Sequence, residues 1–506
     1  MSLSLTHSSA TRGRAQALVP LCLGAGAYLL FLYLGDALLK DSDSFWQIKI
    51  GQWILDHHAL PYTDFYSFTH FGEPWISTSW LSQVLFAIAH AQLDWAGPVI
   101  LSSLAIAIAT AIFVYRLDAH LEPARSVLVA LLALALSTGH MLARPHILAL
   151  PVMVAWIGAL MAAADRRGSP SWLWLPLMAL WANLHGGFVL GLALIAPIAL
   201  EAVWEARADR RIALGLRWML FGVGALIASC CTPYGWKTLL GAANILSLGR
   251  VLSLIGEWQA SDFSSFTPFE GALLGLIAFG FYRGLVISPP RILLVLGLIW
   301  MALTHVRNIE IFAFLVPLVL AKPLGSLSPS ISVDTDAQRG DVLLTRHVTA
   351  LAAVTIVIAA WASTSIYLTR HRFTFTTTHT PVAAVDLLKQ QKAQRVFNAY
   401  EFGGYLISRD IPVFIDGRAE LYGESFEMDF YRATHVPRID NLEHLLETYR
   451  IDTTLLVAKA AVAQVMDHLK GWKRLYADDI AVVHVRDDRP NTAPVAAGSD
   501  EQSVSR

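Results

Sequence analysis

The sequence predicts an α-helical polytopic membrane protein with a C-terminal α/β domain outside the membrane. The first observation is composition: 55% of the 506 residues are hydrophobic and only 15% are charged, whereas an average soluble domain has about 25% charged residues. The second is a series of apolar segments long enough to cross a bilayer. The third is a return to ordinary charge density and mixed residue patterns after about residue 380.

The apolar segments predict about 11 to 13 transmembrane helices, since a span needs about 17 to 25 mostly apolar residues. Eleven segments stand out, at 17–39, 96–116, 124–138, 144–164, 171–184, 187–205, 211–229, 268–283, 290–304, 307–322 and 349–369. Arg12 and Arg14 precede the first segment and no small-x-small cleavage site follows it. We therefore expect a cytoplasmic tail over 1–16, an uncleaved signal anchor and a membrane domain over 17–370.

The distribution of Arg and Lys predicts which loops face the cytoplasm, because short basic loops stay on that side. The basic stretches are the N-terminus, 116–125, 165–170, 206–211, 283–291 and 322–347. With eleven spans, all six fall on one side. This requires residues 80–91 to lie in the interface or to enter the bilayer only part-way, rather than to cross it. The first external loop, 40–79, and the C-terminal domain are then expected on the opposite side.

The first external loop opens with DSDSFW, in which Asp41 and Asp43 are separated by one serine. Two carboxylates at this spacing can converge on one divalent cation; the alternative is a solvated end of a span. Apolar residues at helical spacing follow, which predicts a helix along the membrane surface. Such a helix would hold the two carboxylates at the depth of lipid headgroups.

Basic and imidazole side chains mark three other external loops, at GHMLARPH, NLHGG and THVRN. Arginine can bind a phosphate with two parallel hydrogen bonds, and histidine can add a donor. If these loops converge, they form one anion pocket; the alternative for each residue is an ordinary loop or packing role. The candidate phosphate-binding residues are Arg144, His146, His185, His305 and Arg307.

Five further residues are candidates for contact with a sugar or an acceptor: Trp46, Tyr234, Glu257, Asp416 and Arg418. For Glu257, a place in a metal shell or simple solvation are alternatives. Tyr234 lies in a predicted turn and offers a hydroxyl donor. Asp416 and Arg418 belong to FIDGR, which is also typical of a hairpin or strand end in which Arg418 pairs with Asp416 or Glu420.

The last domain is predicted over 380–487 as a compact α/β unit, followed by a disordered tail over 488–506. Strands are expected at 395–400, 412–416, 453–457, 472–477 and 480–485, and helices at 382–392, 440–449 and 460–469.

Several function classes are disfavoured by the sequence. It contains no P-loop, no Rossmann fingerprint, no G-x-S-x-G elbow and no H-E-x-x-H motif. We therefore expect no nucleotide cofactor, no ATP-driven transport and none of the common hydrolase activities. The formal net charge of -1 gives no basic field for nucleic acid.

With these residues in view, the chain resembles the GT-C superfamily of polytopic membrane glycosyltransferases, and most of all the bacterial branch described as RgtA/B/C/D-like. The likeness rests on DSDSFW after the first span, the helix WQIKIGQWILDHHALP, the segment TDFYSFTHFGEPWISTSWL, the many further spans and the external C-terminal domain. It implies sugar transfer from a polyprenyl-phosphate donor to a lipid, glycan or protein acceptor. Asp41 or Asp43 would be catalytic, with Mg²⁺ or Mn²⁺ bound at the pair in some branches.

The resemblance also implies a bacterial inner membrane protein whose partners are a polyprenyl-phosphate sugar and membrane lipids. Two other functions stay open. A lipid or polysaccharide transporter predicts charges buried in the middle of the spans. A non-catalytic envelope assembly protein predicts an essential external domain and a dispensable acidic pair.

Overall fold

A computed structural model of the chain describes residues 3–246, 248–254, 256–327, 342–435 and 439–487; the predicted tail at 488–506 lies outside these ranges. The chain forms two compact units. Unit 1 comprises residues 1–61 and 76–375, and unit 2 comprises 62–75 and 376–506. A short piece of the predicted first external loop therefore folds with the C-terminal unit, which the sequence did not reveal.

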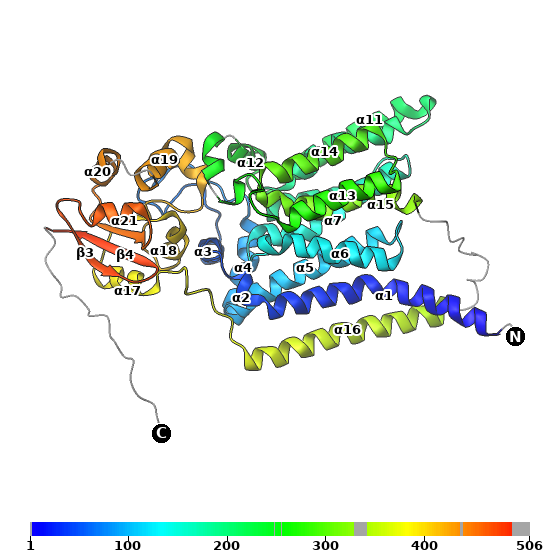
Figure 1. Ribbon diagram of the computed structural model, residues 1–506, viewed down its shortest axis with the longest axis horizontal. Helices are drawn as coiled ribbons and strands as arrows, with labels where there is room; N and C mark the ends of the chain where they lie inside the picture. The colour runs from blue at the N-terminus through cyan, green and yellow to red at the C-terminus, as the bar shows by residue number, and fades with distance from the viewer. Residues whose placement is uncertain (1–2, 247, 255, 328–341, 436–438, 488–506) are drawn as a thin grey trace, which may run out of the picture. The chain divides into compact units, whose positions relative to one another are not determined.

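Unit 1 is helical, and every one of the eleven predicted spans coincides with helix. Its main helices run along one another (Figure 1). The α-helices of unit 1 in the described ranges are α1 (Leu3–Tyr33), α2 (Gly35–Leu38), α3 (Asp43–His57), α4 (Trp80–Leu93), α5 (Ala96–Leu117), α6 (Pro123–Ser137), α7 (Pro145–Asp165), α8 (Leu175–Leu184), α9 (Phe188–Ala193), α10 (Ile195–Trp204), α11 (Arg211–Ser229), α12 (Lys237–Leu246), α13 (Pro268–Arg283), α14 (Pro289–Thr304), α15 (Ile309–Ser326) and α16 (Val342–Arg370). Short 3-10 turns include η1 (Thr138–His140), η5 (Gly256–Trp258) and η6 (Val306–Asn308).

Ten helical segments in the described part of the chain have the apolar character of membrane spans. Six are long enough to cross a bilayer, at 96–117, 123–140, 145–165, 208–229, 306–326 and 349–370. Four are shorter, at 18–33, 172–184, 188–204 and 289–304. The remaining predicted span, 268–283, is helix α13. The prediction of a polytopic helical membrane domain is confirmed.

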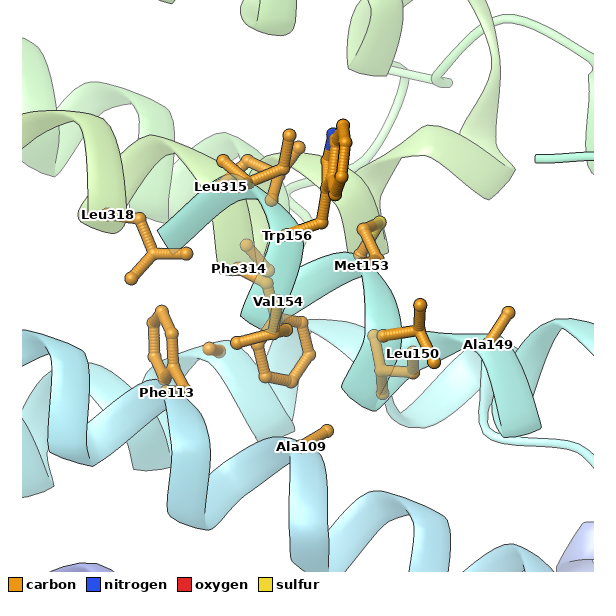
Figure 2. Packing of buried hydrophobic residues seen from close by; sticks show 14 of the residues in the cluster. Ala109, Phe113, Ala149, Leu150, Met153, Val154, Trp156, Phe314, Leu315 and Leu318 are labelled. Atoms are coloured by element: carbon orange, nitrogen blue, oxygen red, sulfur yellow. The ribbon is translucent and has the colours of Figure 1, made fainter. Parts of the chain in front are cut away.

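Helix α7 forms the centre of the bundle. It is apolar on all sides, as expected for a helix buried among other helices, and it packs against α5, α8, α10 and α15. Trp156 is fully buried, and its indole donates a hydrogen bond to the carbonyl of Gly191 at 3.1 Å. Figure 2 shows side chains of α5, α7 and α15, among them Phe113, Val154 and Phe314, filling this core.

Helices α7, α14 and α15 carry charges only near their ends. Arg291 at the start of α14 pairs with Asp165 at the end of α7, at 2.7 Å, and with Glu201 of α10. Between the ends, residues 147–164, 292–304 and 311–321 contain no charged side chain. A helix of 20 residues spans about 30 Å, so the pair of Arg291 and Asp165 lies about a bilayer thickness from the start of α7, which has 21 residues.

Helix α3 confirms the helix predicted next to the acidic pair and begins at Asp43; its place along a membrane surface stays a prediction. Its apolar residues are buried, with Phe45, Ile48 and Ile50 at most 6% exposed, and it packs against α4. The two helices approach closely at Gly51, where an added Cβ would lie 2.0 Å from the carbonyl oxygen of Gln83. The apolar face of α3 therefore packs against other parts of the protein. This packing holds Asp43, in the first turn of α3, in place.

Unit 2 confirms the predicted α/β domain. It contains a four-stranded sheet in the order β1-β2-β4-β3, in which β1 and β2 are parallel and the other pairs are antiparallel. The elements are α17 (Val382–Gln390), β1 (Val396–Asn398), α18 (Gly403–Ser408), α19 (Ala419–Thr434), α20 (Ile439–Thr448), β2 (Thr453–Val457), α21 (Ala461–Met466), β3 (Trp472–Ala477) and β4 (Ala481–Arg486).

The prediction of a strand at 412–416 is wrong, because this segment contains only an isolated bridge residue, Val413. Val413 makes only isolated bridges, to Val396 and to Ser67, and the amide of Phe414 donates to the side chain of Asn398 at 2.8 Å. The backbone groups of this segment are therefore shared among separate partners, one of which lies in residues 62–75, and no continuous ladder forms.

A buried ion cluster joins residues 62–75 to the rest of unit 2. Arg418 donates to Asp64 at 2.6 Å and to both carboxylate oxygens of Asp416, at 2.8 and 2.7 Å. The hydroxyl of Tyr422 donates to Asp416 at 2.6 Å. The side chains of Arg418, Asp64 and Asp416 are 0% exposed. Burial opposes the charge of Arg418, but Asp416 and its other partners hold the pKa of the guanidinium above its ordinary value.

Candidate functional site

The candidate site lies in unit 1, where the DSDSFW segment meets the loop between α6 and α7. The amide of Ala143 donates to the carbonyl of Leu38 at 2.8 Å, and the hydroxyl of Ser44 donates to the carbonyl of Ala143 at 3.0 Å. These two hydrogen bonds hold the start of α3 against the residue that precedes Arg144.

Arg144 contacts both carboxylates of the acidic pair. Its backbone is extended, with φ -127° and ψ 161°, as expected for a residue before proline, and α7 begins at Pro145. Its guanidinium lies 3.0 Å from Asp41 through Nη1 and 2.6 Å from Asp43 through Nη2. Residues about 100 positions apart in the sequence therefore meet within hydrogen-bond distance.

Glu257 extends this cluster to a second arginine. Its carboxylate lies 3.3 Å from Arg144 and 3.1 Å from Arg307. The guanidinium of Arg307 also stacks over the ring of Trp258, 4.3 Å from the ring centroid, a favourable cation–π arrangement. Nδ1 of His305 is 2.7 Å from the carbonyl oxygen of Trp258, so this nitrogen carries the proton. Together these contacts fix the loop that carries Glu257.

The two histidines deeper in the site are oriented by backbone groups. Nε2 of His146 lies 2.8 Å from the carbonyl oxygen of His140, and since a carbonyl only accepts, His146 is the donor. Nδ1 of His185 accepts the amide of Gly187 at 3.1 Å. Burial, with Arg307 and Arg144 nearby, lowers the pKa of His185 to about 3. His185 is therefore a neutral ring whose Nε2–H is a donor, and not an imidazolium.

Glu310 is a carboxylate that the sequence analysis did not single out. It lies in the first turn of α15, is 7% exposed, and its Oε2 is 4.0 Å from Nε2 of His146. An acidic residue inside an otherwise apolar span is costly and commonly functional, and that signal was available in the segment 307–322.

Protonation differs sharply among the carboxylates. Burial raises the pKa of Asp43 to about 7, with Arg144 opposing the shift and Asp41 adding to it. Burial would also raise the pKa of Glu257, but Arg144 and Arg307 outweigh it and lower that pKa to about 2. Near neutral pH, Asp43 exchanges its proton readily while Glu257 stays ionised.

The polar groups of the cluster remain reachable from solvent. The side chains of Asp41, Asp43 and Arg144 are 21%, 15% and 19% exposed, and those of Glu257 and Arg307 are 24% and 26% exposed. Such partial burial strengthens electrostatic interactions while leaving room for a ligand to approach.

The cluster does not have the arrangement of a metal site. In the described ranges, no group of three or more His, Cys, Asp or Glu residues is placed to hold a metal ion. The oxygens of Asp41 and Asp43 that face the cluster are hydrogen-bonded to Arg144. A divalent cation at this pair would have to displace the guanidinium of Arg144, so the acidic pair as arranged does not fit a metal ion.

The structure brings together most of the predicted site residues. Asp41, Asp43, Arg144, Glu257 and Arg307 form one contact network. His146, His185 and His305 surround it: the rings of the first two are 6.3 Å apart, and the third packs against Trp258.

The other four predicted residues are buried, and their side chains form hydrogen bonds within the protein. Trp46 is 6% exposed and its indole donates to Asp43 at 2.9 Å. Tyr234 is 5% exposed and its hydroxyl donates to the carbonyl of Pro61 at 3.0 Å. Asp416 and Arg418 form the buried cluster of unit 2, and the predicted alternative of their mutual pairing is confirmed. This burial argues against direct contact of any of the four with an acceptor.

No model of a known protein family matches the chain, and no curated protein does. Among solved structures, the chain is similar to the archaeal oligosaccharyltransferase AglB from Archaeoglobus fulgidus, in complex with an inhibitory peptide and a dolichol-phosphate. The TM-score is 0.53 at 12% sequence identity, and the match covers 94% of this chain and 75% of AglB. At this identity the likeness establishes the fold alone. The chain has a GT-C-like membrane fold, as its sequence predicted.

Proposed function

We propose that the protein is an integral membrane glycosyltransferase that moves a sugar from a polyprenyl-phosphate donor to an acceptor outside the cytoplasm. The observation that carries the proposal is the contact of Arg144 with Asp41 and Asp43, in a chain that shares its fold with an oligosaccharyltransferase. The dolichol-phosphate bound to that relative is a polyprenyl phosphate, which supports the donor class proposed here. The acceptor is a lipid, a glycan or a protein.

In the proposed reaction, an acceptor hydroxyl attacks the anomeric carbon of the donor sugar and the bond from that carbon to the phosphate oxygen breaks. Asp43 takes the hydroxyl proton. Its pKa of about 7 matches the range in which a general base works best at neutral pH. Asp41 accepts the backbone amide of Asp43 at 2.8 Å and so holds the base in place.

The leaving polyprenyl phosphate carries away the electron pair and gains negative charge. Arg144 and Arg307 would stabilise that charge, as fixed cations do in a partly dehydrated site. His146, His185 and His305 would add hydrogen-bond donors or acceptors around the phosphate and the sugar. We propose no role for Mg²⁺ or Mn²⁺, because Arg144 occupies the carboxylates that would bind it.

A transporter is a weaker explanation of the same residues. A path for a polar substrate would need polar groups along its length, and residues 147–164, 292–304 and 311–321 of the central helices have no charged side chain. We propose instead that chemistry takes place at one end of the bundle, on the periplasmic side of a bacterial inner membrane. On its sequence pattern, we propose that the enzyme is related to the RgtA/B/C/D-like branch of the GT-C transferases.

The test is transfer from a panel of radiolabelled polyprenyl-phosphate sugars in membranes that contain the protein. Wild type is expected to transfer at least one sugar, while Asp43→Asn and Arg144→Ala lose most of the activity. Asp56→Asn is the matched control, since Asp56 is an exposed acid at the other end of α3. Equal transfer by wild type and Asp43→Asn would end the catalytic assignment. Absence of wild-type transfer from every donor would refute the donor class.

A further inference from the structure

The carboxylate of Glu257 occupies the position between two arginines. Its Oε2 lies 3.3 Å from Arg144 and its Oε1 lies 3.1 Å from Arg307. A carboxylate and a phosphate group each offer a guanidinium two or more oxygens in similar geometry. The two cations proposed to bind the donor phosphate are therefore already bridged by an anion of the protein itself.

Glu257 differs in this respect from the acidic pair. Within the described residues, it is the one carboxylate that lies within 4.0 Å of both arginines. Asp43 is further held by the indole of Trp46, and Asp41 by a backbone amide. The described hydrogen bonds of the Glu257 side chain go to Arg144 and Arg307 alone, so these two residues determine where it lies.

The side chain of Glu257 can leave while its loop stays. Beyond the contact of His305 with Trp258, the amide of Val306 donates to the carbonyl of Gln259 at 2.9 Å, and the hydroxyl of Ser261 donates to the carbonyl of Ala302 at 2.8 Å. The backbone after Glu257 is thus tied to the end of α14 and to η6. The side chain is 24% exposed, which gives it a route to solvent by rotation.

We infer that Glu257 is a placeholder anion: it bridges Arg144 and Arg307 when the site is empty, and the phosphate of an isoprenyl phosphate displaces it. This inference rests on the proposed donor site. If Glu257 stayed between the arginines, it would repel an incoming phosphate, because like charges at close range disfavour each other. Its return after transfer would favour release of the polyprenyl phosphate product.

The test measures binding of farnesyl monophosphate, a short isoprenyl phosphate, to the full-length protein in nanodiscs. Glu257→Gln removes the competing charge and keeps the size of the side chain. The variant is therefore expected to bind farnesyl monophosphate with a Kd about tenfold lower than that of wild type. Asp262→Asn removes a charge from the same loop; Asp262 is fully exposed and bonds to Ser264, so its Kd should match wild type. Arg144→Met should bind at least tenfold more weakly.

The outcomes separate the inference from the function beneath it. If Arg144→Met weakens binding but Glu257→Gln binds no more tightly than wild type, the placeholder is wrong and the phosphate site stands. If Arg144→Met and wild type bind farnesyl monophosphate equally, the assignment of the phosphate site is wrong, and the inference about Glu257 is wrong with it. Should Glu257→Gln fail to fold, Glu257→Asp replaces it: the shorter side chain bridges two arginines poorly, so an unchanged Kd would overturn the inference.

Discussion

Replacing Arg418 with methionine should destabilise unit 2 more than replacing its partner Asp64 with asparagine. Arg418 makes three side-chain hydrogen bonds, one to Asp64 and two to Asp416. All three side chains are 0% exposed. The substitution leaves two carboxylates without their cation in the interior, whereas Asp64→Asn leaves the pair of Arg418 and Asp416 intact.

The magnitudes follow from this charge count. Breaking a buried ion pair by removing one partner costs about 3–5 kcal/mol, and Arg418→Met falls at the upper end because it strands two anions. Asp64→Asn removes the charge from the hydrogen bond with Arg418 and replaces one of the two oxygens that also accept from Tyr66 and Ser67. Because Arg418 and Asp416 stay paired, this change costs about 1.5–3 kcal/mol. As a control, Arg432→Met should cost less than about 0.5 kcal/mol, because Arg432 and its partner Asp429 are both more than half exposed.

Native-state hydrogen exchange of the full-length protein in detergent measures these differences. The amides of β2 and β4 report the opening free energy of unit 2, since both strands lie inside its sheet. The predicted order of stability is wild type and Arg432→Met, then Asp64→Asn, then Arg418→Met. Protection in Arg418→Met equal to that of Arg432→Met, or higher than that of Asp64→Asn, would refute the reasoning about the buried charges.

Three further predictions concern single residues. Asp43→Asn should lower sugar transfer about 10²–10⁴-fold. Wild-type activity should rise with pH through about 7, because Asp43 then loses its proton and can act as a base. A wild-type pH profile without that inflection would contradict the role of Asp43 as general base. Burial raises the pKa of Glu427 to about 8, so the folded state keeps a proton that the unfolded state loses and stability falls as pH rises from about 4 to 8. Thermal midpoints of Glu427→Gln should fall less over this window than those of wild type or of the exposed control Glu447→Gln. Gly51→Ala places a Cβ 2.0 Å from a backbone carbonyl of α4 and should lower both stability and sugar transfer. In the control Gly26→Ala, the added Cβ meets nothing within 4 Å, so neither should change. Equal behaviour of the two variants would show that the close approach of α3 and α4 at Gly51 is unimportant.

The spans and the small domain were predictable because they depend on local patterns. An apolar run of bilayer length predicts a helix whatever its neighbours are, and the segments at 96–116 and 453–457 became α5 and β2 with almost unchanged bounds. The pairing of Arg418 with Asp416 was predicted for the same reason, since the two residues are two positions apart.

Contacts between distant parts of the chain left no such signal. Asp64 and Arg418 are 354 positions apart, and nothing in either segment indicates the other. Burial of Trp46 and Tyr234 was missed because an aromatic residue at a span end is typical of both a membrane interface and a packed interior. Most residues of the candidate site could therefore be picked out from the sequence, while the division between its contacting and supporting residues required coordinates.

The membership of residues 62–75 in unit 2 limits how this protein can be rearranged. The chain leaves unit 1 after Pro61, contributes Asp64 and the bridge from Ser67 to Val413, and returns at Ile76. A fragment that starts near residue 376 would lack an ionic partner of Arg418, and a deletion of the same region would strand Asp64. Residues 376–506 therefore cannot be exchanged alone: a chimera would need to exchange residues 62–75 together with them.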